Sequence, residues 1–181
     1  MFTYSDDIRT RAAKIKLLCL DVDGVLTSGH LYFSADGEQL KVFNSLDGHG
    51  IKMLQASGVD VAIISGRRSE ALIKRATDLG IKHLYLGCED KLGHAQNLLQ
   101  KLELDFSQFA HVGDDLPDLP LITRAGLGVC VDNAHWLLKQ NSNYRTQLPG
   151  GEGAVREICD LIMDAQGTLA NSHAAYLAAD E

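Results

Sequence analysis

Short apolar runs alternate along the chain with longer segments in which apolar residues recur every three or four positions. The runs are rich in β-branched residues and end in glycine, aspartate or serine, which is typical of strands buried on both faces of a parallel sheet. These predicted strands span residues 15–20, 59–65, 82–86, 109–113 and 127–131. The helical pattern covers residues 50–56, 69–79, 92–102, 116–124 and 153–165. The alternation predicts an α/β fold, a Rossmann-like three-layer sandwich around a mainly parallel sheet.

Residues 30–43 interrupt this alternation. Two strand-like runs flank the turn signal Asp36-Gly37, which predicts a β-hairpin inserted after the first core strand. The segments between the predicted strands leave no room for a cap domain, and neither a repeat nor a linker divides the chain. We therefore expect one domain over residues 1–181, with a short alanine-rich tail, 168–181, that is mobile or held by a partner.

Composition narrows the class of protein. The 181 residues carry 17 basic and 24 acidic side chains, a net charge of -7, which disfavours a nucleic-acid binder. No apolar stretch approaches the ~20 residues needed to span a membrane, and the N-terminus has no signal-peptide core. The four cysteines form no CxxC pair, and most of them lie in apolar runs. These features favour a cytoplasmic protein.

Two aspartates follow the first predicted strand at once. Asp21 and Asp23 flank a single valine, and Gly24 then allows the chain to turn away. Ligands of open α/β sheets bind beyond the carboxyl ends of the strands, which is where these carboxylates emerge. A lone Asp-x-Asp pair is equally compatible with an ordinary polar turn, so further evidence is needed.

A second acidic cluster follows another predicted strand. Asp114, Asp115 and Asp118 come directly after residues 109–113. If both strands are central and parallel, these carboxylates meet the first pair at one sheet edge and raise each other's pKa unless a cation intervenes. Carboxylate oxygens suit Mg²⁺, which also pairs with phosphate. Two such clusters make a magnesium site a better interpretation than two polar turns.

A hydroxyl and a cation complete this set. Ser65 ends the strand at 59–65, where its side chain and the backbone amides that follow can hold phosphate oxygens. Lys91 opens the next predicted helix and offers the positive charge that an acidic phosphate site requires. Taken singly, Ser65 is equally suited to cap a helix, and a single lysine is usually solvated.

The order of these motifs resembles that of the haloacid dehalogenase superfamily: DVDGVLT, SGR, a helix-opening lysine and GDDLPD. Over nearly its full length the chain is more closely similar to the 3-deoxy-D-manno-octulosonate (KDO) 8-phosphate phosphatases. The segments that carry this similarity are DVDGVLTSGHLYFSADGEQLKVFNSLDGHGIKML, GDDLPDLPLI and GGEGAVREICDLIM. Sialic-acid-type 9-phosphate phosphatases are close relatives of that family.

The resemblance implies a covalent mechanism. Asp21 attacks phosphorus and becomes an aspartyl-phosphate, which divides the displacement into two easier steps. Asp23 protonates the leaving alkoxide and then deprotonates the hydrolytic water. Mg²⁺ is bound by Asp21, the backbone carbonyl of Asp23, and Asp114.

The remaining polar residues of the motifs are implied to support this chemistry. Ser65 and Lys91 bind the transferring phosphoryl group, where positioning and electrostatics dominate. Asp115 and Asp118 orient the metal ligands and water without binding the metal themselves.

The resemblance also implies a sugar acid phosphate as the substrate. Arg67 and Arg75 lie eight residues apart on one predicted helix, and both are implied to bind in the substrate site. Lys52 stands where arginine is common among relatives, and His49 stands where an aromatic residue is common. The sugar hydroxyls are implied to meet a loop made of Asn44, Ser45, Leu46, Asp47 and Gly48.

Members of this family form tetramers in which hairpins and neighbouring subunits complete each site. The hairpin at 30–43 therefore predicts a homotetramer, although the same pattern also fits an ordinary surface hairpin. The expected reaction is magnesium-dependent hydrolysis of KDO 8-phosphate in lipopolysaccharide biosynthesis.

Two alternatives remain. One is a phosphatase of a nine-carbon ulosonate 9-phosphate. The other is a catalytically silent oligomerisation module, which would be expected to lack Asp21 or Asp23, whereas both are present. A dinucleotide-binding role is disfavoured because no GxGxxG motif follows the first strand.

Overall fold

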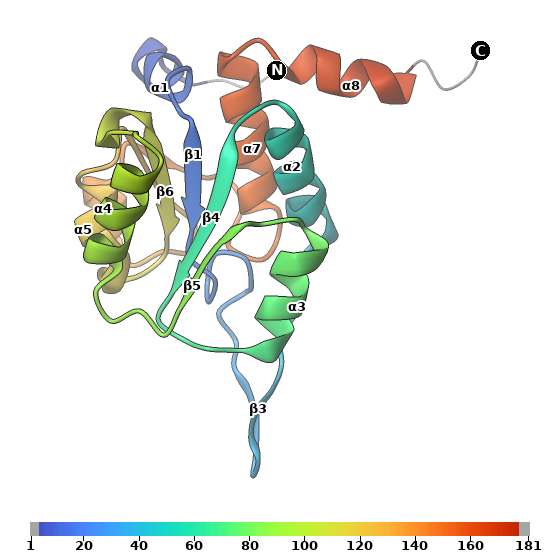
Figure 1. Ribbon diagram of the computed structural model, residues 1–181, viewed down its shortest axis with the longest axis vertical. Coiled ribbons are helices and arrows are strands. Elements are labelled where there is room, and N and C mark those ends of the chain that lie inside the picture. Colours follow the sequence, from blue (N-terminus) through green and yellow to red (C-terminus); the bar gives the residue numbers. More distant parts are fainter. Residues whose placement is uncertain (1–3, 178–181) are drawn as a thin grey trace.

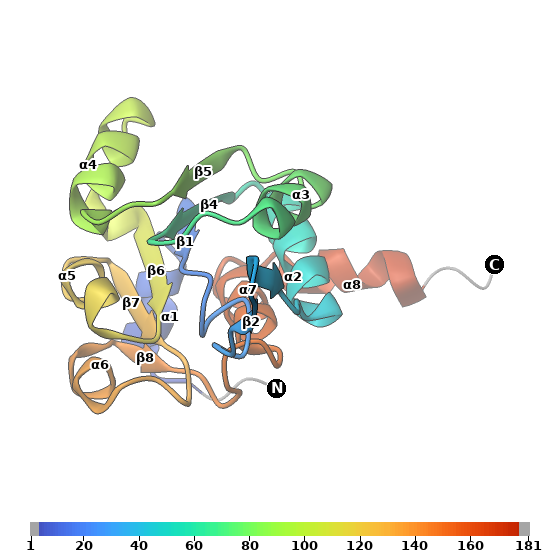
Figure 2. The same ribbon diagram turned by 90° about the horizontal axis from the view of Figure 1, so that it is seen from below.

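The computed structural model describes residues 4–177, which form a six-stranded sheet between two layers of helices (Figures 1 and 2). The strands run in the order β5-β4-β1-β6-β7-β8, and every neighbouring pair is parallel. Their bounds are β1 (Leu17–Leu20), β4 (Asp60–Ser65), β5 (His83–Leu86), β6 (Phe109–Gly113), β7 (Leu127–Cys130) and β8 (Tyr144–Arg145). The predicted α/β fold with a mainly parallel sheet is confirmed.

Helices cover both faces of this sheet. One layer holds α2 (Ser45–Ala56), α3 (Glu70–Asp78) and α7 (Ala154–Ala165), with α1 (Asp6–Ala12) packed against α7. The other layer holds α4 (Lys91–Lys101) and α5 (Leu119–Ile122), beside which lies α6 (Trp136–Asn141). The short 3₁₀ turns are η1 (Phe106–Gln108) and η2 (Leu116–Asp118). No helix among the described residues is long and apolar enough to cross a membrane.

Successive side chains of β1 point to opposite faces of the sheet and pack into two separate hydrophobic cores. Leu18 and Leu20 pack into the cluster under α2 and α7, whereas Leu17 and Cys19 pack into the cluster under α4 and α5. All four side chains are fully buried, as expected of a central parallel strand. Because successive residues of a strand point to opposite faces, the next position, Asp21, continues on the α4 side of the sheet.

A hairpin of β2 (Tyr32–Ser34) and β3 (Gly37–Leu40) extends from the body beyond the end of the sheet (Figure 1). Its strands are antiparallel, and Gly37 takes a positive φ of 102° at the turn. The predicted hairpin is therefore confirmed. Within residues 4–177 no cap domain is inserted between the strands.

Two helical predictions were wrong in their bounds. Helix α2 begins at Ser45 rather than residue 50, because the side chain of Asn44 accepts the backbone N–H of Leu46 and caps it. The segment predicted as a sugar-binding loop is thus the first turn of a helix. Residues 116–124 contain η2 and the short α5 instead of one helix, with a proline near the start of each. Helix α3 (Glu70–Asp78) lies within one residue of its predicted bounds at each end, but it does not include Arg67, so the expectation that Arg67 and Arg75 share a helix was wrong.

The sequence pattern also missed some elements at the ends of the fold. Helices α1 and α6 and the two-residue strand β8 were not predicted. Within the tail predicted to be mobile, Leu169–Leu177 form a helix, α8, which runs outward from the end of α7 (Figure 1). Residues 178–181 of that tail lie outside the described residues.

Candidate active site

Three neighbouring strands end at one edge of the sheet with the predicted polar residues. Asp21 follows β1, Ser65 ends β4, and Asp114 follows β6. The chain runs outward from β1 through β4 to β5 and then returns to the other side of β1 with β6. Ligands of open α/β sheets bind where the direction of winding reverses in this way.

A cleft of about 590 Å³ opens at this edge. Eight of the predicted site residues line it: Asp21, Asp23, Ser65, Arg67, Lys91, Asp114, Asp115 and Asp118. The structure also adds Gly66, Cys88, Glu89 and Pro117 to the lining. The tertiary fold therefore assembles the four motifs, which are far apart in the sequence, around a single cavity.

The turns after β1 and β6 touch each other directly at Gly24. Its φ is 94°, and a Cβ added there would lie 2.1 Å from Oδ2 of Asp114. A side chain at this position would therefore displace the Asp114 carboxylate and strain the backbone. Gly24 allows the two acidic turns to approach each other.

Lys91 joins the two acidic clusters. Its Nζ donates to Oδ1 of Asp21 and to Oδ1 of Asp118, at 2.7 Å in each case. All three side chains are buried, and a buried ammonium is stable only when anions compensate its charge. Burial alone would lower the pKa of Lys91, but Asp21 and Asp118 outweigh it and raise that pKa above its usual value. Lys91 is therefore a fixed positive charge.

His111 supports this lysine from behind, although sequence reasoning gave it no role in the site. Its side chain is fully buried on β6, stacked on Phe109, and its Nε2 lies 2.9 Å from Oδ1 of Asp118. Burial would raise the pKa of Asp118, but hydrogen bonding to His111 and the charge of Lys91 lower it below its usual value. The period of two in β6 places His111 on the Phe109 face, which is the sequence signal that could have revealed this contact.

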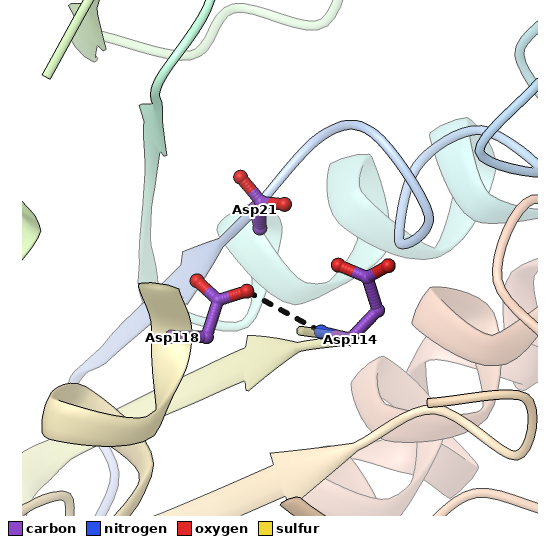
Figure 3. A group of neighbouring side chains, drawn as sticks. All are labelled: Asp21, Asp114 and Asp118. Carbon is purple, nitrogen blue, oxygen red and sulfur yellow. Dashed lines mark hydrogen bonds between the residues drawn. The ribbon is translucent and has the colours of Figure 1, made fainter. Parts of the chain in front are cut away.

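The carboxylates of Asp21, Asp114 and Asp118 crowd together (Figure 3). Each offers an oxygen, and these oxygens lie within 4.8 Å of one another. Burial raises the pKa of Asp21 to about 6 and that of Asp114 to about 7, and the negative charges of their neighbours add to both shifts. Such a group of hard oxygen ligands with unfavourable mutual repulsion suits a divalent cation.

Asp118 is less accessible to a metal than Asp21 and Asp114. Its side chain is 1% exposed, and both of its oxygens already accept hydrogen bonds. Oδ1 accepts from Lys91 and lies beside His111, and Oδ2 accepts the backbone N–H of Asp114 at 3.3 Å (Figure 3). These contacts favour an orienting role for Asp118, and the open side of Asp114 faces the cleft.

Asp23 is held by two cations. Lys41, which follows β3, forms an ion pair with its Oδ1, and Nε of Arg67 lies 3.8 Å from its Oδ2. Lys41 was not recognised from the sequence. Arg67 lies in the loop between β4 and α3, which explains how it reaches this edge of the sheet without belonging to the helix.

Ser65 is buried at the end of β4, with an exposed fraction of 2%. Its Oγ accepts the backbone N–H of Arg67 at 3.3 Å, so the hydroxyl hydrogen can be directed into the cleft. Asp115 is exposed at the rim and accepts the backbone N–H of Leu116.

Several predicted substrate contacts lie outside the cleft. They are Asn44, Ser45, Leu46, Asp47, Gly48, Lys52 and Arg75. Arg75 donates to the carbonyl of Asn44 at 3.3 Å and packs over Phe43, so it contacts the start of α2 and does not line the cleft beside Arg67.

Asp47, which was predicted to contact sugar hydroxyls, is almost fully buried and does not line the cleft. Its side chain is 1% exposed and its Oδ1 accepts the backbone N–H of Arg156 at 2.8 Å. Gly153, at the N-cap position of α7, has no side chain to cap that helix. Asp47 supplies the missing acceptor from α2 and thereby joins two helices.

Comparison with known proteins identifies relatives over almost the whole chain. Residues 89–158 match the haloacid dehalogenase-like hydrolase family. The 3-deoxy-D-manno-octulosonate 8-phosphate phosphatase KdsC of Yersinia pestis is 50% identical over 165 residues, 91% of this chain and 88% of the relative.

Two crystal structures are similar in fold as well as sequence. A probable YrbI-family phosphatase from Pseudomonas syringae superposes with a TM-score of 0.94 and 53% identity, covering 96% of this chain and 98% of the other. The KDO 8-phosphate phosphatase of Moraxella catarrhalis, in complex with a magnesium ion, a phosphate ion and KDO, gives a TM-score of 0.93 and 40% identity, covering 96% and 99%.

Proposed function

Since the chain belongs to the KDO 8-phosphate phosphatase family of haloacid dehalogenase-like hydrolases, we propose that it hydrolyses KDO 8-phosphate to KDO and phosphate. The observation that carries this proposal is the cleft at the ends of β1, β4 and β6, where Lys91 from the start of α4 joins Asp21 and Asp114. Free KDO produced in this way would serve lipopolysaccharide biosynthesis.

Asp21 is the nucleophile of the proposed reaction. One of its carboxylate oxygens forms a bond to phosphorus as the bond between phosphorus and the sugar oxygen breaks, which leaves an aspartyl-phosphate. Lys91 contacts Oδ1 of Asp21 at 2.7 Å, so its ammonium is placed to stabilise negative charge on the transferring group. Ser65, at the end of β4, supplies a hydroxyl to the same oxygens.

Asp23 is the general acid and base of the proposed reaction. Its carboxyl group gives a proton to the departing sugar oxygen, and its carboxylate then takes a proton from the water that attacks the aspartyl-phosphate. It lies two positions after Asp21 in the chain, and its side chain is 21% exposed, which leaves it access to substrate and water. The protons therefore balance over one turnover.

The acidic cluster fits Mg²⁺, with Asp21, Asp114 and the backbone carbonyl of Asp23 as the proposed ligands and Asp115 and Asp118 as orienting residues. The ion, when bound, neutralises charge on the phosphoryl oxygens and on the carboxylates around it. The raised pKa values of Asp21 and Asp114 support this assignment, because burial and the neighbouring carboxylates outweigh the positive charge of Lys91 at both groups.

The proposal is tested by measuring phosphate release from KDO 8-phosphate and from a sialic acid 9-phosphate, with Mg²⁺ or with EDTA. We expect magnesium-dependent turnover, a higher kcat/KM for the eight-carbon substrate, and loss of both activities in Asp21→Asn. Asp60→Asn, on the exposed first position of β4, is the matched control and retains activity. A preference for the nine-carbon substrate would contradict the proposed substrate but not the chemistry. No turnover of either compound would favour a silent module.

We also propose that the protein acts in the cytoplasm as a homotetramer. The hairpin supports assembly, because its strands carry exposed apolar side chains that water solvates poorly. Leu31, Tyr32, Phe33, Leu40 and Val42 are 39–62% exposed. Four buried cysteines without disulfides fit a reducing compartment. Light scattering should give four times the chain mass for the wild type and a smaller species for Phe33→Glu.

A further inference from the structure

Lys41 lies at the base of the hairpin, directly after β3, and its side chain points into the protein. It is 3% exposed, whereas the side chains on either side belong to residues that are largely exposed, Leu40 at 62% and Val42 at 61%. Successive side chains of an extended segment point in opposite directions, so the returning chain turns its charged residue inward and its apolar residues outward. Lysine is almost never this buried without a charged partner.

Asp23 is a charged partner of Lys41. The ammonium forms an ion pair and a hydrogen bond with Oδ1 of Asp23. The second cation near Asp23 is Arg67, whose Nε is 3.8 Å from Oδ2 and whose side chain is 49% exposed, so water screens that contact. The burial of Lys41 makes its contact with Asp23 the stronger restraint on this carboxylate.

Lys41 does not line the cleft formed by Asp21, Asp23, Ser65 and the other site residues. This placement favours an effect on the reaction that passes through Asp23 rather than through contact with the transferring phosphoryl group. Asp23 follows β1 by three residues and lies in a turn, so the backbone of the sheet alone does not fix the orientation of its carboxylate. The hairpin supplies that restraint.

We propose that Lys41 is a positioning residue, which holds the Asp23 carboxylate in the orientation needed for general acid–base catalysis and so couples the hairpin to the reaction. This inference rests on the proposed function, because it takes Asp23 as the group that protonates the leaving oxygen. The proton that reaches the leaving oxygen comes from Asp23, and Lys41 acts through its ion pair with that carboxylate.

The test compares leaving groups in the Lys41→Met variant. The value of kcat/KM reports only on the steps from substrate binding to departure of the leaving group, so hydrolysis of the aspartyl-phosphate does not affect it. Comparing kcat/KM between leaving groups therefore measures the protonation by Asp23. Phenyl phosphate and KDO 8-phosphate have poor leaving groups that need this proton, whereas p-nitrophenyl phosphate has a good one. We expect kcat/KM to fall about 10- to 100-fold for the first two substrates and less than about threefold for p-nitrophenyl phosphate.

The other outcomes overturn the proposal in different ways. An equal loss on all three substrates would show that Lys41 only maintains the folded site. A loss confined to KDO 8-phosphate would show that Lys41 recognises the sugar acid. Because the result is a ratio measured on one preparation, a lower folded fraction in the variant does not change it.

Two further variants sharpen the comparison. Lys41→Arg keeps a cation at this position and should restore part of the rate on phenyl phosphate, which a purely steric role would not produce. Lys74→Met, on the exposed face of α3, removes a lysine that does not line the cleft and should leave all three values unchanged. A wild-type protein that hydrolysed none of the three substrates would refute the proposed function itself. An active wild type with an unchanged Lys41→Met ratio would refute only the role of Lys41.

Discussion

The ammonium of Lys91 lies 2.7 Å from Oδ1 of Asp21. In the proposed reaction the carboxylate of Asp21 accepts the phosphoryl group. The same ammonium lies 2.7 Å from Asp118, so one buried cation separates two buried anions. This arrangement gives Lys91 a structural role as well as a chemical one. Both roles can be measured separately.

Lys91→Met should lower kcat/KM by about 10²–10³-fold, because an electrostatic donor to the transferring group is lost. It should also destabilise the metal-free protein at neutral pH by about 3–5 kcal/mol, since Asp21 and Asp118 then face each other without a cation. Steady-state kinetics and urea unfolding measure the two effects. Lys101→Met, at the exposed end of the same helix, is the control. A variant with more than a tenth of wild-type kcat/KM would contradict the role assigned to Lys91.

His111→Phe should keep the stacking on Phe109 but remove the polar contact with Asp118. We expect stability to fall by about 1–3 kcal/mol, because a buried carboxylate loses one partner. We also expect kcat to fall about tenfold with KM nearly unchanged, since Asp118 then positions Lys91 less firmly. Thermal unfolding and kinetics test this. His94→Phe, which is partly exposed on α4, is the control. Unchanged kcat would show that His111 serves only the core.

Magnesium should stabilise the protein more at pH 8 than at pH 5. In the metal-free state the pKa of Asp21 is raised to about 6 and that of Asp114 to about 7, from a usual value of 3.8. Their contribution to stability is therefore complete below pH 4 and is lost as pH rises through 6 to 7. A bound cation holds both groups ionised and reverses this loss.

The expected difference in magnesium stabilisation between the two pH values is about 1–3 kcal/mol. Thermal unfolding with Mg²⁺ or EDTA at each pH measures it, and the comparison cancels the pH dependence of all other groups. Asp114→Asn should abolish most of the magnesium response. Equal stabilisation at pH 5 and pH 8 would contradict the assignment of these carboxylates to the metal site.

Asp47→Ala should reduce stability by about 1–2 kcal/mol, because the N-terminus of α7 loses its acceptor. The KM for KDO 8-phosphate should stay within about twofold of the wild-type value, since Asp47 is buried away from the cleft. Asp78→Ala, at the exposed end of α3, is the matched control. A large rise in KM without loss of stability would contradict this prediction and would support the sugar contact that the family resemblance implied.

The sequence alone determined the class of fold and the chemistry of the motifs. Fully apolar strands separated by helices allow few arrangements other than a parallel sheet covered on both faces. In such a sheet, carboxylates that directly follow β1 and β6 must emerge at the same edge. For this reason Asp21 and Asp114 could be assigned to one site before their distance was known.

Only the tertiary structure decided which other side chains join that site. Lys41 and His111 are single polar residues inside apolar segments, and their partners lie 18 and seven residues away in the chain. Arg75 and Asp47 were predicted to contact substrate, yet Arg75 donates to the backbone at the start of α2 and Asp47 accepts from the N-terminus of α7. The physical reason is that a pattern of hydrophobic positions specifies which face of an element is buried, whereas the partner of a buried charge depends on how the elements pack.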